Sequence, residues 1–376
     1  MDFIRYFKSR QGEMVSLLKE MVNLESPSSD KKAVDESSSF VVKGFRKLGA
    51  KITAFPQEKI GDIYLAEYQP GDPKVKKEQI LLLTHVDTVW PVGKINKMPF
   101  YIAEKKIYGP GVLDMKAGIV VVLSSLKAMR ELKIEPKKRI AVFINSAEEI
   151  GSRPSYELIK RLAKKSVYVL CMEPALPGGK LKMQRKGRLV IQLSAEGKPA
   201  HAGTPEKGVS AVEELLAHLS RLKQIRTKER TVNIGLIGGG EKANIVAKNA
   251  YAVLDIRFWD YVQKEHIMRF FKELKPVLRG ARVKFSIESS TPPMEKTKAS
   301  MNLFHRIKEI GESLGLKLEE GKTGGGSDAS IASSLGIPTV DGLGPDGNGI
   351  HAENEHLLLP SLVERTALLT EVLSQL

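Results

Sequence analysis

The sequence has little cysteine and no long apolar run, and each of these absences excludes a class of protein. A single cysteine, Cys171, rules out an internal disulfide framework and a cysteine-cluster zinc site, and it fits a reducing compartment. The longest apolar run, Ala117–Leu123, is far shorter than the roughly 18 residues that a membrane span needs. Residues 1–25 mix lysine and glutamate with apolar residues at helical spacing, unlike a signal peptide. We therefore expect a soluble, cytoplasmic protein with no membrane partner, and an amphipathic helix over residues 1–25.

Acidic residues are scarce relative to basic ones. The 376 residues include 59 lysine and arginine against 44 aspartate and glutamate residues, a net charge of +15. Residues 178–291 hold 22 of the basic and 11 of the acidic residues, so most of the excess positive charge lies in this central block. A solvated lysine-rich surface, attraction of an acidic small substrate and nucleic-acid binding are all compatible with it. No cysteine-histidine finger and no aromatic-rich run accompany the charge, so we expect no nucleic-acid partner.

The first 177 residues alternate between buried strands and amphipathic helices. Gln79–Val86 is a short, continuous apolar run, which is typical of a strand covered on both faces of a sheet. Asp114–Leu132 has helical spacing and starts with an aspartate at a helix-capping position. This alternation predicts a mainly parallel sheet with helices on its faces. The further elements expected here are a strand at Arg139–Ala147, a helix at Ser155–Lys164 and a strand at Val167–Met172.

The central block has a different order of elements, strand-helix-strand-strand-helix-strand, which indicates a separate α+β unit. The alternation of the first part returns after Thr291-Pro292-Pro293, a linker. We therefore expect an α/β fold in which a mainly parallel-sheet domain, residues 1–177 and 292–376, is interrupted by a β-α-β-β-α-β domain at 178–291. The expected elements are strands at Lys186–Glu196, Thr231–Ile237, Val246–Trp259 and Arg282–Glu288, helices at Glu206–Lys223 and Asp260–Pro276, then a helix at Ala299–Leu314, a loop at Gly321–Ser327, a strand at Ile337–Val340 and a helix at Pro360–Leu376.

Acidic and histidine side chains gather at the ends of the predicted strands and in the loops between elements. In an open α/β sheet, ligands bind at the carboxyl ends of the strands. Several carboxylates packed together there would repel one another, so a stable site requires a cation, and two divalent metal ions would meet that requirement. Imidazole and carboxylate without thiolate suit zinc first and manganese or cobalt next. The residues concerned are His85, Asp87, Asp114, Glu148, Glu149, Glu173 and His351.

Each of these residues alone has an ordinary structural interpretation. One histidine two residues before an aspartate, as in His85 and Asp87, is more often a structural histidine beside a turn. Asp114 before a helix is ordinarily a helix cap. Glu148 and Glu149 could form a solvated loop pair, although adjacent glutamates directly after a buried strand are costly without a cation nearby. Their occurrence together, in order and at successive strand ends, is what favours a metal site.

Five segments carry a resemblance to a known family: THVDTV at residues 84–89, YGPGVLDMKAG at 108–118, AEEIGS at 147–152, EP at 173–174 and GIHAENE at 349–355. They resemble the di-zinc metallopeptidases that include glutamate carboxypeptidase, acetylornithine deacetylase, succinyl-diaminopimelate desuccinylase and aminoacylase. The resemblance covers nearly the whole chain and is closest to glutamate carboxypeptidase. It implies that residues 1–177 and 292–376 form a catalytic di-metal domain and that 178–291 form a dimerisation domain.

The resemblance also implies a role for each residue of the site. His85 and Glu173 would hold one zinc ion, Glu149 and His351 would hold the other, and Asp114 would bridge both. No position in this ligand set departs from the family pattern.

Three further residues resemble groups that act on the substrate or orient a ligand. Glu148 resembles the general base that takes a proton from the attacking water and returns it to the leaving amine. Asp87 resembles the carboxylate that orients His85 through its other ring nitrogen. His201, in the segment GKPAHAG at 197–203, resembles the histidine that reaches a partner subunit's site and polarises the scissile carbonyl.

The substrate's carboxylate would be bound by residues of the central block and of a glycine-rich loop. Asn244 and Arg257 resemble family residues that contact the substrate, and arginine can bind a planar carboxylate through two hydrogen bonds. Gly325, Gly326 and Ser327 lie in the loop GKTGGGSDAS, whose main-chain N–H groups are suited to an anion.

We therefore expect a metal-dependent hydrolase that releases an amino acid with a free α-carboxylate from a small peptide or acyl-amino-acid substrate, as a homodimer. Glutamate carboxypeptidase is the favoured subtype. The alternatives are an N-acyl amino acid deacylase, of the acetylornithine deacetylase or succinyl-diaminopimelate desuccinylase type, and a dipeptidase. An alternative of a different class is a basic polyanion-binding protein on a relic hydrolase fold, against which the complete ligand set argues.

Overall fold

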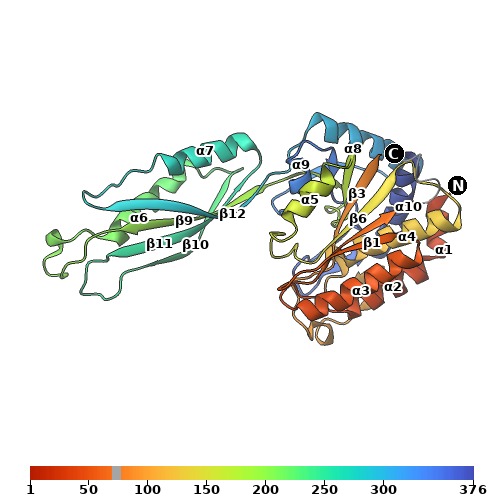
Figure 1. The fold of residues 1–376 in the computed structure, drawn as a ribbon, viewed down its shortest axis with the longest axis horizontal. Helices are drawn as coiled ribbons and strands as arrows, with labels where there is room; N and C mark the ends of the chain where they lie inside the picture. The colour runs from red at the N-terminus through yellow and green to blue at the C-terminus, as the bar shows by residue number, and fades with distance from the viewer. Residues whose placement is uncertain (70–77) are drawn as a thin grey trace. The chain divides into compact units, whose positions relative to one another are not determined.

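The structure, a computed structural model, describes residues 1–69 and 78–376 (Figure 1). The chain divides into two compact units. The first unit contains residues Met1–Met183, Lys296–Lys322 and Ser327–Leu376, and the second contains Gln184–Glu295 and Thr323–Gly326. A search of the described residues finds no helix with both the length and the hydropathy to cross a membrane.

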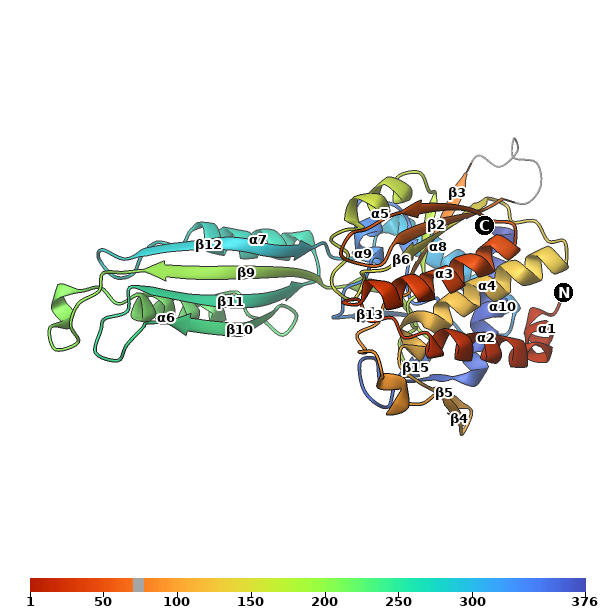
Figure 2. The same cartoon turned by 60° about the horizontal axis from the view of Figure 1, so that its bottom comes forward.

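A six-stranded sheet with the order β1-β2-β6-β3-β7-β14 forms the centre of the first unit (Figure 2). The four strands from β6 to β14 run parallel to one another, while β1 and β2 are antiparallel. This arrangement confirms the expected α/β class with a mainly parallel sheet, although β1 and β2 were not predicted. The strands are β1 (Lys51–Phe55), β2 (Ile63–Tyr68), β3 (Gln79–His85), β6 (Arg139–Asn145), β7 (Tyr168–Cys171) and β14 (Thr339–Val340).

Helices cover both faces of this sheet. Every residue of β3 is buried, as its continuous apolar sequence predicts. In Figure 1, α2, α3 and α4 lie on one side of the sheet, and α5, α8 and α9 lie on the other. The helices are α1 (Phe3–Ser9), α2 (Gln11–Asn23), α3 (Lys31–Lys47), α4 (Ala117–Glu131), α5 (Tyr156–Ala163), α8 (Lys298–Ser313), α9 (Ala329–Ser333) and α10 (Leu359–Gln375).

Two helices of the first unit differ from their predictions. The opening helix is interrupted at Arg10, which separates α1 from α2. The helix expected from Asp114 begins only at Ala117, so Asp114 is not a helix cap. Asp114 instead has an extended conformation (φ −112°, ψ 98°) within the turn Val112–Lys116, and the peptide bond that follows it is cis.

Two further sheets are small. One has the order β15-β16-β5-β4, and the other pairs β8 with β13. In the first of them, β5 leads into the segment of Asp114, and it pairs with β16, which follows the segment of His351. The loop predicted at Gly321–Ser327 begins later than expected, because β13 extends through Thr323. The strands are β4 (Tyr101–Ala103), β5 (Lys106–Tyr108), β8 (Leu181–Arg185), β13 (Glu320–Thr323), β15 (Gly347–Asn348) and β16 (His356–Leu358).

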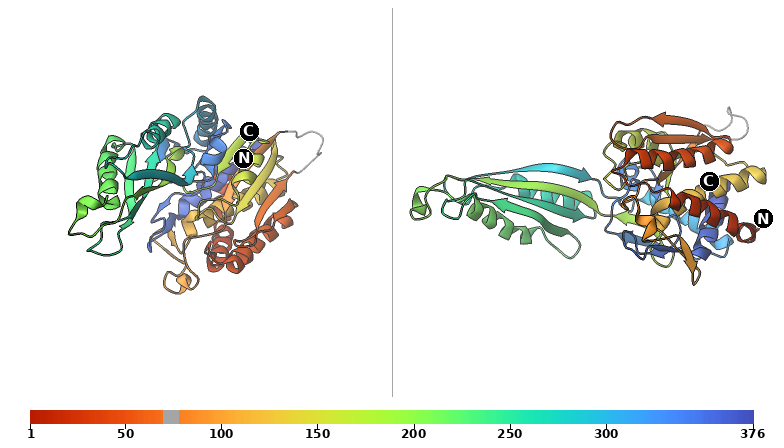
Figure 3. Two further views of the ribbon diagram at one scale, coloured as in Figure 1. Left: turned by 60° about the vertical axis from the view of Figure 1, so that its left-hand side comes forward. Right: turned by 90° about the horizontal axis from the view of Figure 1, so that it is seen from below.

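The second unit is a four-stranded antiparallel sheet in the order β10-β11-β9-β12, with α6 and α7 on one face (Figure 3). The predicted strand-helix-strand-strand-helix-strand order is therefore correct. Alternate residues of β9 are buried, because only one face of this sheet packs against the helices. The elements are β9 (Gly187–Glu196), α6 (Ala211–Arg221), β10 (Thr231–Gly239), β11 (Asn249–Phe258), α7 (Tyr261–Lys272) and β12 (Arg282–Thr291).

The first helix of this unit is shorter than the predicted Glu206–Lys223. Val209 exchanges main-chain hydrogen bonds with Lys198, as a strand residue does, so the chain is extended there. Ser210 then caps α6, because its hydroxyl accepts a hydrogen bond from the main-chain N–H of Glu213.

Candidate metal centre

Three neighbouring parallel strands of the first unit deliver most of the predicted site residues. His85 is the last residue of β3, Glu148 and Glu149 follow β6, and Glu173 follows β7. These strands are adjacent in the order β6-β3-β7 and parallel, so their carboxyl ends meet at one edge of the sheet.

Two loops bring the remaining predicted ligands to this edge. Asp114 is held in the turn before α4, and His351 lies in the loop between β15 and β16 with a positive φ of 60°. A non-glycine residue in this left-handed region is uncommon and is kept there only where the surrounding structure holds it.

The side chains form one connected cluster with Asp114 in the middle. His85 Nε2 lies 3.3 Å from Asp114 Oδ1 and 3.3 Å from Glu173 Oε1. His351 Nε2 lies 3.1 Å from Glu149 Oε2 and 3.5 Å from Asp114 Oδ2. Each oxygen of the Asp114 carboxylate therefore faces a different histidine, which is the arrangement of a bridging ligand.

These separations fit metal coordination. Two ligand atoms that each lie about 2.1 Å from one tetrahedral zinc ion are separated by about 3.4 Å. His85 Nε2 and Asp114 Oδ1 are also fully buried, and neither has a hydrogen-bond partner in the described part of the chain. Buried polar atoms that face each other in this way are costly unless a cation lies between them. Among the described residues, two groups could each hold an ion. One is His85 with Glu148 and Glu173, and the other is His85 with Asp114 and Glu149.

The pKa values of the cluster also indicate a demand for positive charge. Burial opposes the charged form of His85, yet the surrounding Asp114, Asp87 and Glu173 raise its pKa well above the usual value. Hydrogen bonds to Asp114 and Glu149 raise the pKa of His351 to about 10. A metal ion would replace these protons, since a histidine ligand must be neutral.

Burial raises the pKa of both adjacent glutamates, and the rise is larger at Glu148 than at Glu149. Burial raises the pKa of the Glu148 carboxyl group well above the usual value, and the charge of Glu173 raises it further. A carboxylate with a raised proton affinity beside a metal cluster has the property that a general base requires.

Asp87 is fully buried and organises the loop of the two glutamates. Its carboxylate accepts hydrogen bonds from the main-chain N–H groups of Glu148 (3.2 Å) and Glu149 (3.1 Å), and from the Ser28 hydroxyl (2.7 Å). The nearest acceptor to His85 Nδ1 is the main-chain oxygen of Asp87 at 3.0 Å, and the carboxylate lies at 3.5 Å. Asp87 therefore contacts His85 chiefly through its backbone.

Glu355 is a buried residue of the site for which the sequence predicted no role. It lies within the GIHAENE segment, but an acidic residue four positions after a histidine gives no signal of its partners. Its carboxylate accepts hydrogen bonds from the turn that carries Asp114 and from Trp90. Burial raises the pKa of Glu355 to about 7.

Lys182 and Asp328 were also missed. Lys182 is a buried lysine on β8 whose Nζ lies 3.9 Å from Glu173 Oε2. Asp328 is buried and accepts hydrogen bonds from Asn145 and Ser152, which flank the loop of the two glutamates. Neither residue could be placed from the sequence, because each meets its partner only through the fold.

The substrate residues predicted in the central block lie in the second unit. His201 is exposed and pairs by a backbone bridge with Ile245, beside Asn244. Its Nδ1 accepts a hydrogen bond of 3.0 Å from the main-chain N–H of Gly203, so a neutral ring carries its proton on Nε2. Arg257 donates hydrogen bonds to Asp255 and to the main-chain oxygen of Gly324.

The glycine-rich loop is held by side chains at two points. The buried Arg185 donates hydrogen bonds to the main-chain oxygens of Gly325 (3.3 Å) and Gly326 (2.7 Å), a contact that the sequence did not predict. Ser327 is buried, and its hydroxyl donates to Asp341 at 2.8 Å.

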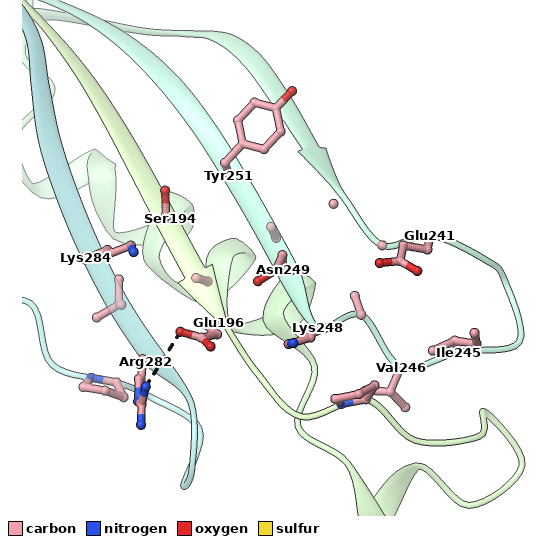
Figure 4. Close-up of a pocket in the computed structure, with 18 of the residues that line it drawn as sticks. Ser194, Glu196, Glu241, Ile245, Val246, Lys248, Asn249, Tyr251, Arg282 and Lys284 are labelled. Atoms are coloured by element: carbon pink, nitrogen blue, oxygen red, sulfur yellow. Dashed lines mark ion pairs between the residues drawn. The ribbon is translucent and has the colours of Figure 1, made fainter.

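A separate hollow of about 1140 Å³ lies on the exposed face of the second unit's sheet (Figure 4). Its lining carries charges of both signs, including the ion pair of Arg282 with Glu196 at 3.9 Å. None of the predicted ligand or substrate residues lines it. The metal cluster, rather than this hollow, is therefore the candidate site.

The mixed α/β sheet, with histidine and carboxylate side chains gathered at its strand ends, is an arrangement that suits a metal-dependent hydrolase. The model of peptidase family M20/M25/M40 matches residues 81–375, and the chain belongs to this family. The protein is thus a metallopeptidase of the M20 group.

Similar proteins support this assignment. Carboxypeptidase G2 from Pseudomonas sp. (strain RS-16) is 30% identical over 366 residues, which cover 94% of this chain and 87% of that protein. Succinyl-diaminopimelate desuccinylase from Orientia tsutsugamushi (strain Boryong) is 26% identical over 373 residues, 93% of this chain and 92% of that protein. Aminopeptidase PepT from Bacillus cereus shares the fold, with a TM-score of 0.77 and 22% identity over 97% of this chain and 98% of its own. The Bacillus subtilis YXEP protein, a dinuclear metal-binding M20 peptidase, has a TM-score of 0.75 at 15% identity, covering 98% of both chains.

Proposed function

We propose that this protein is a carboxypeptidase of the glutamate carboxypeptidase type, which hydrolyses an amide or peptide bond and releases an amino acid with a free α-carboxylate. The observation that carries the hydrolytic chemistry is the position of Asp114 between His85 and His351, with Glu148 beside the cluster. The similarity to carboxypeptidase G2 along 94% of the chain supports the carboxypeptidase subtype.

Two divalent metal ions, zinc in our proposal with manganese or cobalt as alternatives, would be held by the cluster. His85 and Glu173 would bind one ion, Glu149 and His351 the other, and Asp114 both. Bound there, the ions would act as Lewis acids and lower the pKa of a water molecule. This ligand set leaves Glu148 free of coordination.

Glu148 would move the proton in the reaction. It would take a proton from the water that attacks the scissile carbonyl and return it to the leaving amine. Its raised pKa suits this exchange, because a carboxylate of ordinary acidity would take the water's proton less readily. Asp87 would fix the main chain beneath Glu148 and hold His85 in orientation.

The second unit would supply groups that bind and polarise the substrate. The exposed His201 would donate a hydrogen bond from Nε2 to the oxygen of the scissile carbonyl, in the tautomer that Gly203 favours. Asn244 and Arg257 would contact the substrate as well. The glycine-rich loop would bind its free carboxylate through Gly325, Gly326 and Ser327.

We also propose that residues 178–291 mediate a homodimer in which His201 acts on the partner's site. The edge strand β10 supports a protein interface there, because Ile234, Leu236 and Ile237 are exposed on it, the latter two by about 60%. An edge strand with exposed apolar side chains favours pairing with a second chain.

A product assay on a matched set of substrates tests the proposed specificity. We expect the zinc-loaded protein to release glutamate from acyl-glutamate faster than it cleaves acyl-ornithine, succinyl-diaminopimelate or a dipeptide. Preferred cleavage of the succinylated diamine would instead favour the desuccinylase alternative, which the 26% identical relative supports. Absence of turnover on every member, with two metal ions bound, would refute both.

A further inference from the structure

We infer that Glu355 is a positioning residue that fixes the main chain beneath Asp114 and thereby sets the affinity of the site for metal. The inference rests on the metal centre of the proposed function but not on the identity of the substrate.

Glu355 is fully buried, and both of its carboxylate oxygens are occupied by donors. Oε1 accepts hydrogen bonds from the main-chain N–H groups of Leu113 (2.9 Å) and Asp114 (3.1 Å). Oε2 accepts from the main-chain N–H of Gly111 (2.9 Å) and from Trp90 Nε1 (2.9 Å). All four partners are donors, so the position requires a group that accepts four hydrogen bonds and donates none. An ionised carboxylate is the side chain that meets this requirement.

The turn that Glu355 binds has no regular secondary structure to hold it. Asp114 is extended between Val112 and the start of α4, so its amide has no helical partner. Without Glu355, three main-chain N–H groups in a buried turn would lose their acceptor, and buried donors without an acceptor are costly. Glu355 therefore determines where the Asp114 carboxylate lies.

Glu355 also joins two segments that each carry a ligand. His351 lies four residues before it on the same loop, while Asp114 lies about 240 residues away in sequence. The β5–β16 pairing joins the two segments at Tyr108 and His356, outside the loops that carry Asp114 and His351. The Glu355 carboxylate thus sets the spacing of the two side chains, Asp114 and His351, that face each other across one half of the cluster.

The test compares zinc binding of two neighbouring glutamate variants of the full chain. Glu355→Gln keeps the shape but presents an amide NH₂ to two of the four donors. Glu353→Gln is the matched control, because it removes the same charge from the same loop at a residue that is 82% exposed and ion-paired with Lys94. We titrate zinc into the metal-free proteins by calorimetry and count bound zinc by mass spectrometry.

We expect Glu355→Gln to need roughly 10–100-fold more zinc for half-saturation, the usual range for losing a group that orients a ligand. Excess zinc should restore activity to that variant, and Glu353→Gln should bind like the wild type. A purely structural role would lower the unfolding temperature without changing zinc affinity. Two zinc ions bound at the wild-type half-saturation in folded Glu355→Gln would overturn the inference.

A milder variant covers the case in which Glu355→Gln does not fold. Trp90→Phe removes one of the four donors and keeps an aromatic ring, so it should need more zinc than the wild type for half-saturation, but less than the 10–100-fold increase expected for Glu355→Gln. Wild-type zinc affinity in folded Trp90→Phe, with Glu355→Gln unfolded, would overturn the inference as well. Turnover is not needed for these measurements, so a wrong substrate class would leave the zinc result unaffected.

Discussion

The carboxylate of Asp114 has two different imidazoles as neighbours, and from this we predict that its amide cannot replace it. Each oxygen lies within 3.5 Å of a histidine nitrogen, and the side chain is buried. Burial opposes ionisation of Asp114. The contacts with His351 and His85 outweigh this effect and lower the pKa of Asp114 below its ordinary value, so the charged carboxylate is favoured.

Asp114→Asn should abolish both metal binding and hydrolysis. The amide keeps the size of the side chain, but it has one acceptor oxygen and no charge, so it cannot bridge two cations. Metal content by mass spectrometry and product release measure the two effects. A fully active variant with unchanged metal content would contradict the bridging role.

Mutation should distinguish the roles of the two adjacent glutamates, Glu148 and Glu149. Glu148→Gln keeps the size and polarity of the side chain but cannot accept the water's proton, so kcat should fall by about 100-fold or more with both metal ions retained. Glu149→Gln should instead lose metal, because its carboxylate lies 3.1 Å from His351. The opposite outcome, metal lost from the first variant and kept by the second, would mean that the two roles are exchanged.

At the scale of elements, α4 packs closely against the end of β7, and this contact positions the segment that carries Glu173. Gly118, in the first turn of α4, has no room for a side chain, because a Cβ there would lie 2.2 Å from the main-chain oxygen of Met172. Met172 immediately precedes Glu173, so this close approach fixes the segment of a ligand.

Gly118→Ala should therefore destabilise the protein by about 1–3 kcal/mol, since a backbone atom cannot move aside cheaply. Gly12→Ala in α2 is the control, because a Cβ at that position meets nothing within 4 Å and should be neutral or stabilising by about 0.5–1 kcal/mol. Urea unfolding of the metal-free proteins measures both. Equal stability of the two variants would contradict the proposed packing.

The sequence was sufficient where local pattern and tertiary environment agree. The apolar runs that became β3, β6 and β7 are buried on both faces, so their continuous apolar sequence indicated the sheet directly. The residues His85, Glu149 and Glu173 follow those runs, and for that reason their meeting at one edge could be predicted. The strands β1 and β2 escaped prediction, because they lie at the antiparallel side of the sheet and carry mixed polarity.

The sequence was insufficient where a distant partner decides the local structure. A helix beginning at Asp114 is a sound prediction from its neighbours alone, yet Glu355, far along the chain, takes the amides that would begin that helix. Lys182 and Asp328 were missed for the same reason, because the local sequence does not indicate a buried charge whose partner lies on another element.

At the scale of the whole molecule, the proposed action of His201 in a partner's site can be tested by complementation. Glu148→Gln and His201→Ala should each be inactive alone. Mixed under conditions that allow subunit exchange, they should regain activity, because some mixed dimers hold one site with both residues intact. Such dimers should reach about half the activity of the wild type, with one of two sites working.

Two measurements complete this experiment. Mass spectrometry of differently labelled chains checks that exchange has occurred, and each variant mixed with itself serves as the control. No recovery despite exchange would mean that His201 acts within its own chain or has no part in the reaction.

The strands that begin and end the main segment of the second unit are neighbours in its sheet. Near the junctions, Arg185 and Met294 exchange two main-chain hydrogen bonds of 3.1 Å, so the chain leaves this unit beside the point where it entered. A module whose ends meet in this way can be acquired by, or removed from, an ancestral gene in one step, because a hairpin turn would reconnect the remaining chain. The same geometry offers protein engineers one pair of adjacent positions at which to exchange the Gln184–Glu295 segment of this unit for another.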